Sequence, residues 1–181
     1  IHEQLVRKDG ESIQTYQAPV LINHSGYLLT KEEKWAKAER NISLLKQTLE
    51  ENGEDPYILY QLGKSYYMAE DYKMASDYFS KALWHDLDPK LEYVITMVET
   101  YGYALLNSGQ KKQALGLTGL EEEFGGKSDF QFLLGLVYMN NEYFEQAVNS
   151  FLKAVSLHNG RVVGVDSYLA YYNIGVIYEC L

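Results

Sequence analysis

The chain is poor in cysteine, proline and basic residues. Its 181 residues include one cysteine, Cys180, which excludes an internal disulfide framework and a zinc site built on paired thiolates. One free thiol is typical of a reducing compartment, so we expect a cytoplasmic protein that can also lie at the membrane periphery. Lysine and arginine number 16 against 25 aspartates and glutamates, and the net charge of -9 argues against a nucleic-acid partner. No apolar run approaches the roughly 18–20 residues of a transmembrane helix.

Two regions of different character follow one another along the chain. Residues 1–29 alternate β-branched and aromatic residues with Gly10, Pro19 and Gly26, a pattern typical of strands and irregular segments. From Thr30 onward the sequence consists of helix-like blocks separated by short polar breaks. Thr30 and Glu33 form a capping-box pattern that predicts a helix start. We expect residues 30–55 to form a capping helix for the region that follows.

A repeat occupies residues 56–181. Leu59, Leu62, Gly63 and Tyr66 have the spacing L-x2-L-G-x2-Y, and Ala75, Phe79 and Ala82 follow on a second predicted helix. The same pattern returns at Leu134, Gly135, Tyr138, Ala147, Phe151 and Ala154, in degenerate form at Tyr101, Gly102, Leu105 and Ala114, and incompletely at Tyr171, Ile174, Gly175 and Tyr178. The pattern resembles the tetratricopeptide repeat. The resemblance implies an all-α, right-handed superhelix of helix-turn-helix units, about three and a half of them, with the second degenerate and the last truncated.

The residue types explain how the two helices of a repeat meet. Small residues let helices approach closely, so we expect Gly63 and Ala75 at the helix contact, with Tyr66 and Phe79 beside them. Ala82 then leaves room for the next repeat. The spacing between Gly135 and Gly175 is longer than a standard repeat and predicts a widened loop at HNGRVVGVDS. The expected helices are 30–52, 56–69, 72–86, 90–107, 111–124, 127–140, 143–157 and 164–181.

The resemblance places the first helix of each repeat on a concave groove. An aromatic groove suits an extended peptide, because tyrosine offers a rigid ring with a polar tip, and it also suits sugar rings. The alternative is that these side chains fill gaps between irregular repeats. A clamp for a C-terminal carboxylate is not expected, since Tyr60 and Lys64 occupy the places of its Lys and Asn pairs. The candidate groove residues are Tyr57, Tyr60, Lys64, Tyr67, Glu99, Tyr103, Phe132, Met139 and Tyr172.

A second resemblance concerns the start of the chain. The segments Ile1-His2-Glu3, His24-Ser25-Gly26-Tyr27 and Arg40-Asn41-Ile42-Ser43-Leu44-Leu45 occur in the order in which bacterial family 2 nucleotide-sugar glycosyltransferases pass into a C-terminal tetratricopeptide extension. The resemblance implies that residues 1–29 are the end of an upstream catalytic domain. The parent enzyme would use a nucleotide-sugar and a divalent metal, Mg or Mn, held by an Asp-x-Asp motif.

Few residues of this chain could belong to such an active site. His2, Glu3 and His24 are the metal-side or donor-side candidates, and the alternative is that the histidines bond backbone at a strand edge. Asp86-Leu87-Asp88 matches the metal motif but lacks its strand context. The chain itself has no expected cofactor and no expected catalytic residue.

These patterns lead to three hypotheses. The first is a repeat module that presents a protein, peptide or glycan acceptor to an upstream sugar-transfer domain. The alternative is a free-standing scaffold for protein–protein interaction, which explains residues 56–181 equally well. In the third, the apolar face of the incomplete last repeat mediates self-association.

Overall fold

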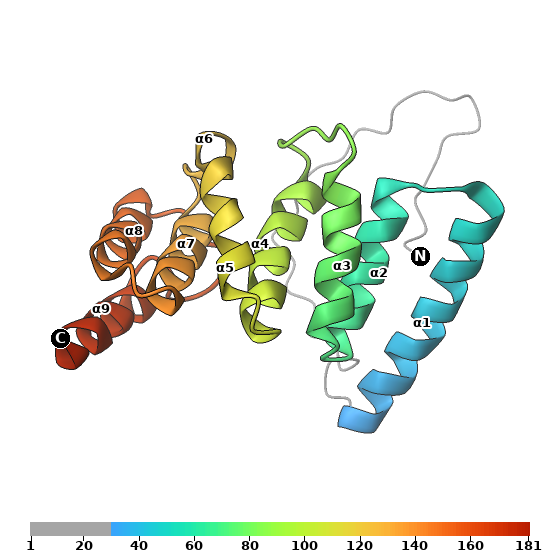
Figure 1. Ribbon diagram of the computed structural model, residues 1–181, viewed down its shortest axis with the longest axis horizontal. Helices are drawn as coiled ribbons and strands as arrows, with labels where there is room; N and C mark the ends of the chain where they lie inside the picture. Colours follow the sequence, from blue (N-terminus) through green and yellow to red (C-terminus); the bar gives the residue numbers. More distant parts are fainter. Residues whose placement is uncertain (1–29) are drawn as a thin grey trace, which may run out of the picture. The chain divides into compact units, whose positions relative to one another are not determined.

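The computed structural model of the chain describes residues 30–181, and this part contains helices and no strand (Figure 1). Residues 31–181 form one compact unit. The α-helices are α1 (Lys31–Asn52), α2 (Pro56–Met68), α3 (Tyr72–Leu83), α4 (Glu92–Asn107), α5 (Lys111–Ala114), α6 (Glu121–Phe124), α7 (Ser128–Asn140), α8 (Phe144–Leu157) and α9 (Tyr168–Cys180). A 3₁₀ segment, η2 (Leu115–Leu120), joins α5 to α6. None of the described helices is long and apolar enough to cross a membrane.

Helices that are neighbours in the chain pack on one another. α2 packs on α3 and α7 on α8, which are the first and second helices of two complete repeats. The first helices also meet across repeats, since α2 contacts α4 and α4 contacts α7 (Figure 1). α1 lies along α2, and α9 packs on α8. The all-α repeat architecture expected from the sequence is therefore confirmed.

The interval between the repeat glycine and the phenylalanine of the second helix is the same in two repeats, and its cause is steric. A Cβ added to Gly63 would lie 2.6 Å from the ring of Phe79, and one added to Gly135 would lie 2.5 Å from the ring of Phe151. Both phenylalanine rings are fully buried. Glycine at this position therefore lets the phenylalanine ring of the second helix pack directly on the first helix, as the sequence predicts.

In the degenerate repeat, a different side chain packs against the repeat glycine, Gly102. At the spacing that gives Phe79 and Phe151, the chain has Thr118 after Gly102. Leu117 fills the place instead, and a Cβ on Gly102 would meet both Leu117 and Leu133. The predicted continuous helix over 111–124 is wrong, because the segment is α5, η2 and α6 in succession. Gly116 and Gly119 lie within the 3₁₀ segment, and glycine disfavours an α-helix by about 1 kcal/mol per residue.

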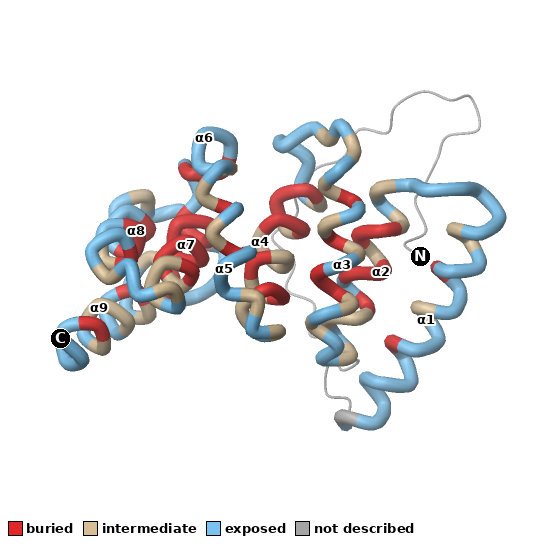
Figure 2. The backbone as a smooth tube through the Cα atoms, in the orientation of Figure 1, coloured by how far each residue is buried: buried red, intermediate tan, exposed pale blue. Residues whose placement is uncertain are grey.

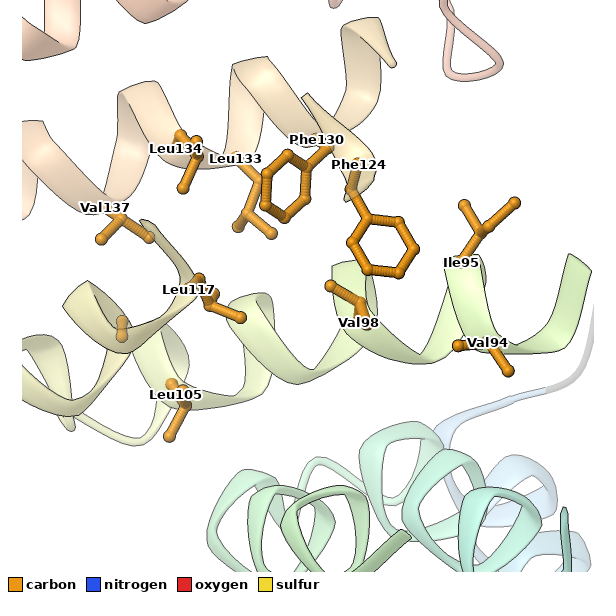
Figure 3. Packing of buried hydrophobic residues seen from close by; sticks show 11 residues of the cluster. Val94, Ile95, Val98, Leu105, Leu117, Phe124, Phe130, Leu133, Leu134 and Val137 are labelled. Carbon is orange, nitrogen blue, oxygen red and sulfur yellow. The ribbon is translucent and has the colours of Figure 1, made fainter. Parts of the chain in front are cut away.

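Buried side chains form three clusters, which appear as the buried tube segments of Figure 2. The first joins α4 and α7 through η2 and α6, and Figure 3 shows the ring of Phe124 between Val98 of α4 and Phe130 of α7. Their ring centroids are 5.7 Å apart. The second cluster joins α2, α3 and α4 around Phe79, and the third joins α7, α8 and α9 around Phe151. Partly buried residues that pack against two clusters, such as Tyr101 and Tyr138, link each cluster to the next.

The turns inside the repeats share one backbone feature. Glu70, Gly109 and Glu142 follow the repeat glycines at the same spacing, and each has positive φ, at 61°, 78° and 66° respectively. Only glycine adopts this left-handed conformation without strain from a Cβ. The short polar breaks that follow the first helices, AED, NSGQ and NNE, are therefore one kind of turn.

Helix starts and the capping helix also follow from local sequence. Pro56 lies in the first turn of α2, and the Asp55 carboxylate accepts the N–H groups of Tyr57 and Ile58 at 2.8 and 3.0 Å. On α1, Ala38 and Leu45 are buried against the repeats. Trp35 is half exposed, and its indole N–H donates to the Ala69 carbonyl at 3.1 Å.

Candidate binding groove

Each first helix carries a stripe of side chains along one face. On α2 the stripe consists of Tyr57, Tyr60, Lys64 and Tyr67, which follow one another at intervals of three or four residues and so share one face. The equivalent stripe on α4 carries Glu92, Glu99 and Tyr103, and on α7 it carries Asp129, Phe132 and Met139. We call the surface formed by these three stripes the groove.

Aromatic rings cluster where α2 meets α4. The ring of Tyr93 lies 5.2 Å from that of Tyr57 at 88°, an edge-to-face arrangement, and 5.6 Å from that of Tyr60. Lys64 places its ammonium 6.0 Å from the Tyr60 ring centroid. Offset and edge-to-face contacts of this kind fix the rings in place. This end of the groove is therefore a pre-formed aromatic surface.

Two tyrosines lie deeper in the groove. Burial raises the pKa of Tyr67 and of Tyr103 above the ordinary tyrosine value, and for Tyr103 the nearby carboxylates of Glu99 and Asp129 add to the rise. A hydrogen bond with Asn107 lowers the pKa of Tyr67 in part. Both phenols therefore stay protonated at neutral pH and can donate hydrogen bonds.

Carboxylates replace the tyrosines toward α7. Burial raises the pKa of Glu99 to about 7, the guanidinium of Arg161 acts against this, and the negative charges of Asp129 and Glu92 act with it. Arg161 binds the carboxylates of both Glu92 and Glu99. Glu99 Oε1 is buried and has no hydrogen-bond partner in the described part of the chain. The groove is thus aromatic over α2 and acidic between α4 and α7.

The structure corrects part of the predicted groove. Tyr60 and Phe132 are only 5% and 7% exposed, because Tyr60 packs into the cluster around Phe79 and Phe132 lies 5.3 Å from the ring of Phe151. For these two, the gap-filling alternative describes the structure better. Tyr57, Lys64 and Tyr172 are exposed, and Tyr67, Glu99, Tyr103 and Met139 are partly buried. Whether any of them binds a ligand stays a prediction.

Sequence reasoning missed several groove residues. Tyr93 and Glu92 lie ahead of the repeat signature on α4, and Asp129 sits in the first turn of α7. Arg161 belongs to the loop between α8 and α9, which the sequence predicts only as widened. The one available signal was the helical interval, because Glu92 lies two turns before Glu99 on the same face.

The predicted metal-side residues His2, Glu3 and His24 lie outside the described residues. Within residues 30–181, no group of three or more histidine, cysteine, aspartate or glutamate side chains is placed to hold a metal ion. Asp88 of the Asp86-Leu87-Asp88 segment has a local structural partner instead, since its carboxylate accepts the Lys90 N–H at 2.9 Å. Leu87 packs against the core.

Comparisons with known proteins agree with this architecture. A family model of the tetratricopeptide repeat matches residues 128–159, which contain α7 and α8. The solved structure described as the MamA RS-1 ArsTM double mutant is 25% identical, with a TM-score of 0.66, covering 80% of this chain and 76% of that chain. YrrB, described as a TPR protein with an unusual peptide-binding site, is 25% identical, with a TM-score of 0.64, covering 80% of this chain and 70% of that chain.

None of the curated proteins matches the chain. Neither the family model nor these two structures is a glycosyltransferase, so the second resemblance gains no support from them. Three observations support the same fold: the glycine–phenylalanine contacts, the repeated left-handed turns and the structural likenesses. They show that the described helices form a tetratricopeptide-repeat fold.

Proposed function

We propose that this chain is a scaffold module that binds an extended segment of a partner protein in the groove. The observation that carries the proposal is the aromatic surface where α2 meets α4, with Tyr93 held edge-to-face against the exposed Tyr57. Fixed tyrosine rings give a large contact area at little cost in side-chain entropy, and their hydroxyl groups bind peptide carbonyls. YrrB, a protein of similar fold, is itself described as having a peptide-binding site.

Charge favours a basic partner segment. The chain has a net charge of -9, and Glu92, Glu99 and Asp129 lie next to the aromatic surface. Complementary charge raises association rates and suppresses partners of like charge. The expected ligand is therefore an extended peptide with aromatic or apolar side chains and at least one cationic residue.

The test begins with selection of peptides that bind residues 1–181 from a random display library, followed by calorimetry on the selected peptides. Tyr57→Ala should weaken binding by about tenfold, the loss expected when a rigid aromatic contact at an interface is truncated. Tyr143→Ala is the matched control, because Tyr143 is also an exposed tyrosine but starts a second helix, α8. Equal losses in the two variants, or no selected peptide sensitive to Tyr57, would refute the groove as the binding surface.

A second proposal rests on the order of the Ile1-His2-Glu3, His24–Tyr27 and Arg40–Leu45 segments. In it, the module presents a protein, peptide or glycan acceptor to an upstream family 2 glycosyltransferase domain that uses a nucleotide-sugar and Mg or Mn. Intact mass and peptide mapping of the native polypeptide test this directly. An upstream domain of roughly 200 residues or more with a strand-end Asp-x-Asp is expected, and a native chain starting near Ile1 would refute it.

A further inference from the structure

The loop between α8 and α9, residues 158–167, returns to the groove. Its Arg161 lies 69 residues beyond Glu92, yet the guanidinium Nη1 donates to Glu92 Oε1 at 2.6 Å. Nη2 donates to Glu99 Oε2, two turns further along the same face of α4. The side chain of Arg161 thus binds two carboxylates of α4, which is the first helix of an earlier repeat.

The backbone of the loop is held as well. Asp129 accepts the N–H of Arg161 on Oδ2 at 2.8 Å and the N–H of Val162 on Oδ1 at 2.9 Å. Asn159 Oδ1 accepts from both the N–H and the hydroxyl of Ser128, at 2.8 and 2.9 Å. The side chain of Asp129, in the first turn of α7, therefore accepts two consecutive backbone N–H groups of the loop.

The anchoring differs between the two ends of this contact. Ser128 and Asp129 are buried, and Val165 at the far side of the loop belongs to the third core cluster. The side chains of Arg161 and Glu92 are by contrast 40% and 78% exposed, whereas that of Glu99 is 12% exposed. Exposed ion pairs contribute little free energy and exchange readily, so the Glu92 side of the contact is open to exchange and the Glu99 side is shielded. The loop is therefore fixed at its base, and the side chain of Arg161 is the part of the contact that solvent and a partner can reach.

Charge at this contact is not balanced. Glu92, Glu99 and Asp129 bring three carboxylates around one guanidinium, and Lys127, the other cation beside them, lines the same small pocket of about 90 Å³ together with Asn159 and Ile95. Glu99 Oε1 remains buried without a partner. Carboxylates thus outnumber cations at this contact, which favours a guanidinium from a partner over a carboxylate.

We propose that residues 159–163 form a strap that occupies the groove between α4 and α7, and that a partner segment enters by exchanging its own arginine for Arg161 on Glu92 and Glu99. This deepens the proposed function, because it names the chemistry of the partner segment. Arginine fits better than lysine, since its planar fork reaches two carboxylates at once, as Arg161 does. The base of the strap stays anchored through Asn159 and Val165 during the exchange.

Hydrogen–deuterium exchange with mass spectrometry on the full chain tests the strap without any partner. In Arg161→Gln, peptides covering 159–166 should exchange about tenfold faster, the factor expected for loss of charge-assisted hydrogen bonds. Lys153→Gln is the matched control, because Lys153 forms an exposed ion pair with Glu121 outside the groove, at 2.8 Å. Unchanged exchange in Arg161→Gln, or equal acceleration in the control, would overturn the strap even if the groove binds peptides.

The displacement step is tested with a hexa-arginine peptide as the probe and hexa-lysine as the charge-matched control. Hexa-arginine should accelerate exchange of residues 159–166 in the wild-type chain several-fold more than hexa-lysine. It should have no such effect in Glu92→Gln/Glu99→Gln. Equal effects of the two peptides, an effect that survives in the double variant, or no effect would overturn the exchange of arginines. Tight binding of selected peptides at Tyr57 without strap release would leave the proposed function intact and reject this inference.

Discussion

Replacing a repeat glycine by alanine should have opposite effects in two helices of this chain. A Cβ at Gly135 in α7 would lie 2.5, 2.6 and 2.8 Å from three ring atoms of Phe151. A Cβ at Gly175 in α9 would have no neighbouring atom within 4 Å in the described part of the chain. The two glycines occupy the same repeat position, so they form a matched pair for one substitution.

The expected magnitudes follow from two competing effects. Alanine favours a helix over glycine by about 1 kcal/mol at both sites. At Gly135 the added methyl group also has to displace the fully buried ring of Phe151, which packs against Phe132 with 5.3 Å between the ring centroids. Overpacking of this kind costs about 1–3 kcal/mol. Gly175→Ala should therefore raise stability by up to about 1 kcal/mol, and Gly135→Ala should be less stable than Gly175→Ala by about 1–3 kcal/mol.

Chemical denaturation followed by circular dichroism measures both variants. Because repeat arrays can unfold in stages, the midpoint and the slope should be compared with those of the wild-type chain. Gly135→Ala/Phe151→Leu should lose less than the sum of its single changes, since the smaller side chain relieves the contact. Equal effects of the two glycine substitutions would refute the steric account of the repeat.

Two further substitutions test the groove and the turns. The pKa of Glu99 is raised from its ordinary value of 4.5 to about 7, so the folded chain binds this proton more tightly than the unfolded chain. The protonated carboxyl group therefore adds to the free energy of unfolding. This contribution is fully present below pH 4.5 and is lost as the pH rises through 7. Glu99→Gln should flatten that part of the stability–pH profile measured by thermal unfolding, and an unchanged profile would contradict the burial of this carboxyl group. Gly109→Ala should destabilise the chain by roughly 1 kcal/mol because φ at this turn is 78°, and denaturation showing no loss would contradict the left-handed turn.

The sequence predicts most of the fold because the decisive residues act locally. Gly63 and Ala75 mark a close helix contact by their small size, with Phe79 beside them, and the structure buries the Phe79 ring against Gly63. Pro56 and Asp55 mark a helix start in the same way. The spacing of polar and apolar residues from Lys111 to Phe124 predicts one helix, whereas the segment forms α5, η2 and α6. Gly116 and Gly119 disfavour an α-helix here, and the segment that contains them is a 3₁₀ helix.

The groove is less predictable because it depends on contacts between repeats. Helical spacing places Tyr60 on the same face as Tyr57, yet only the packing of α3 and α4 decides that Tyr60 is buried and Tyr57 exposed. The return of Arg161 to α4 leaves no local pattern, since its partners are more than sixty residues away. Prediction failed where the deciding contact lies outside the repeat.

The long-range contact between Arg161 and Glu92 also affects the order in which the chain folds. In a repeat array each unit contacts only its neighbours, so folding can start at several places and spread along the chain without closing large loops. The tie between Arg161 and Glu92 closes a loop of 69 residues, and it forms only after α7 and α8 have bridged the interval. Loop-closure entropy and a higher contact order place this step late in folding. The contact is therefore an addition to an array that folds piece by piece, and the strap can open without unfolding the helices that it links.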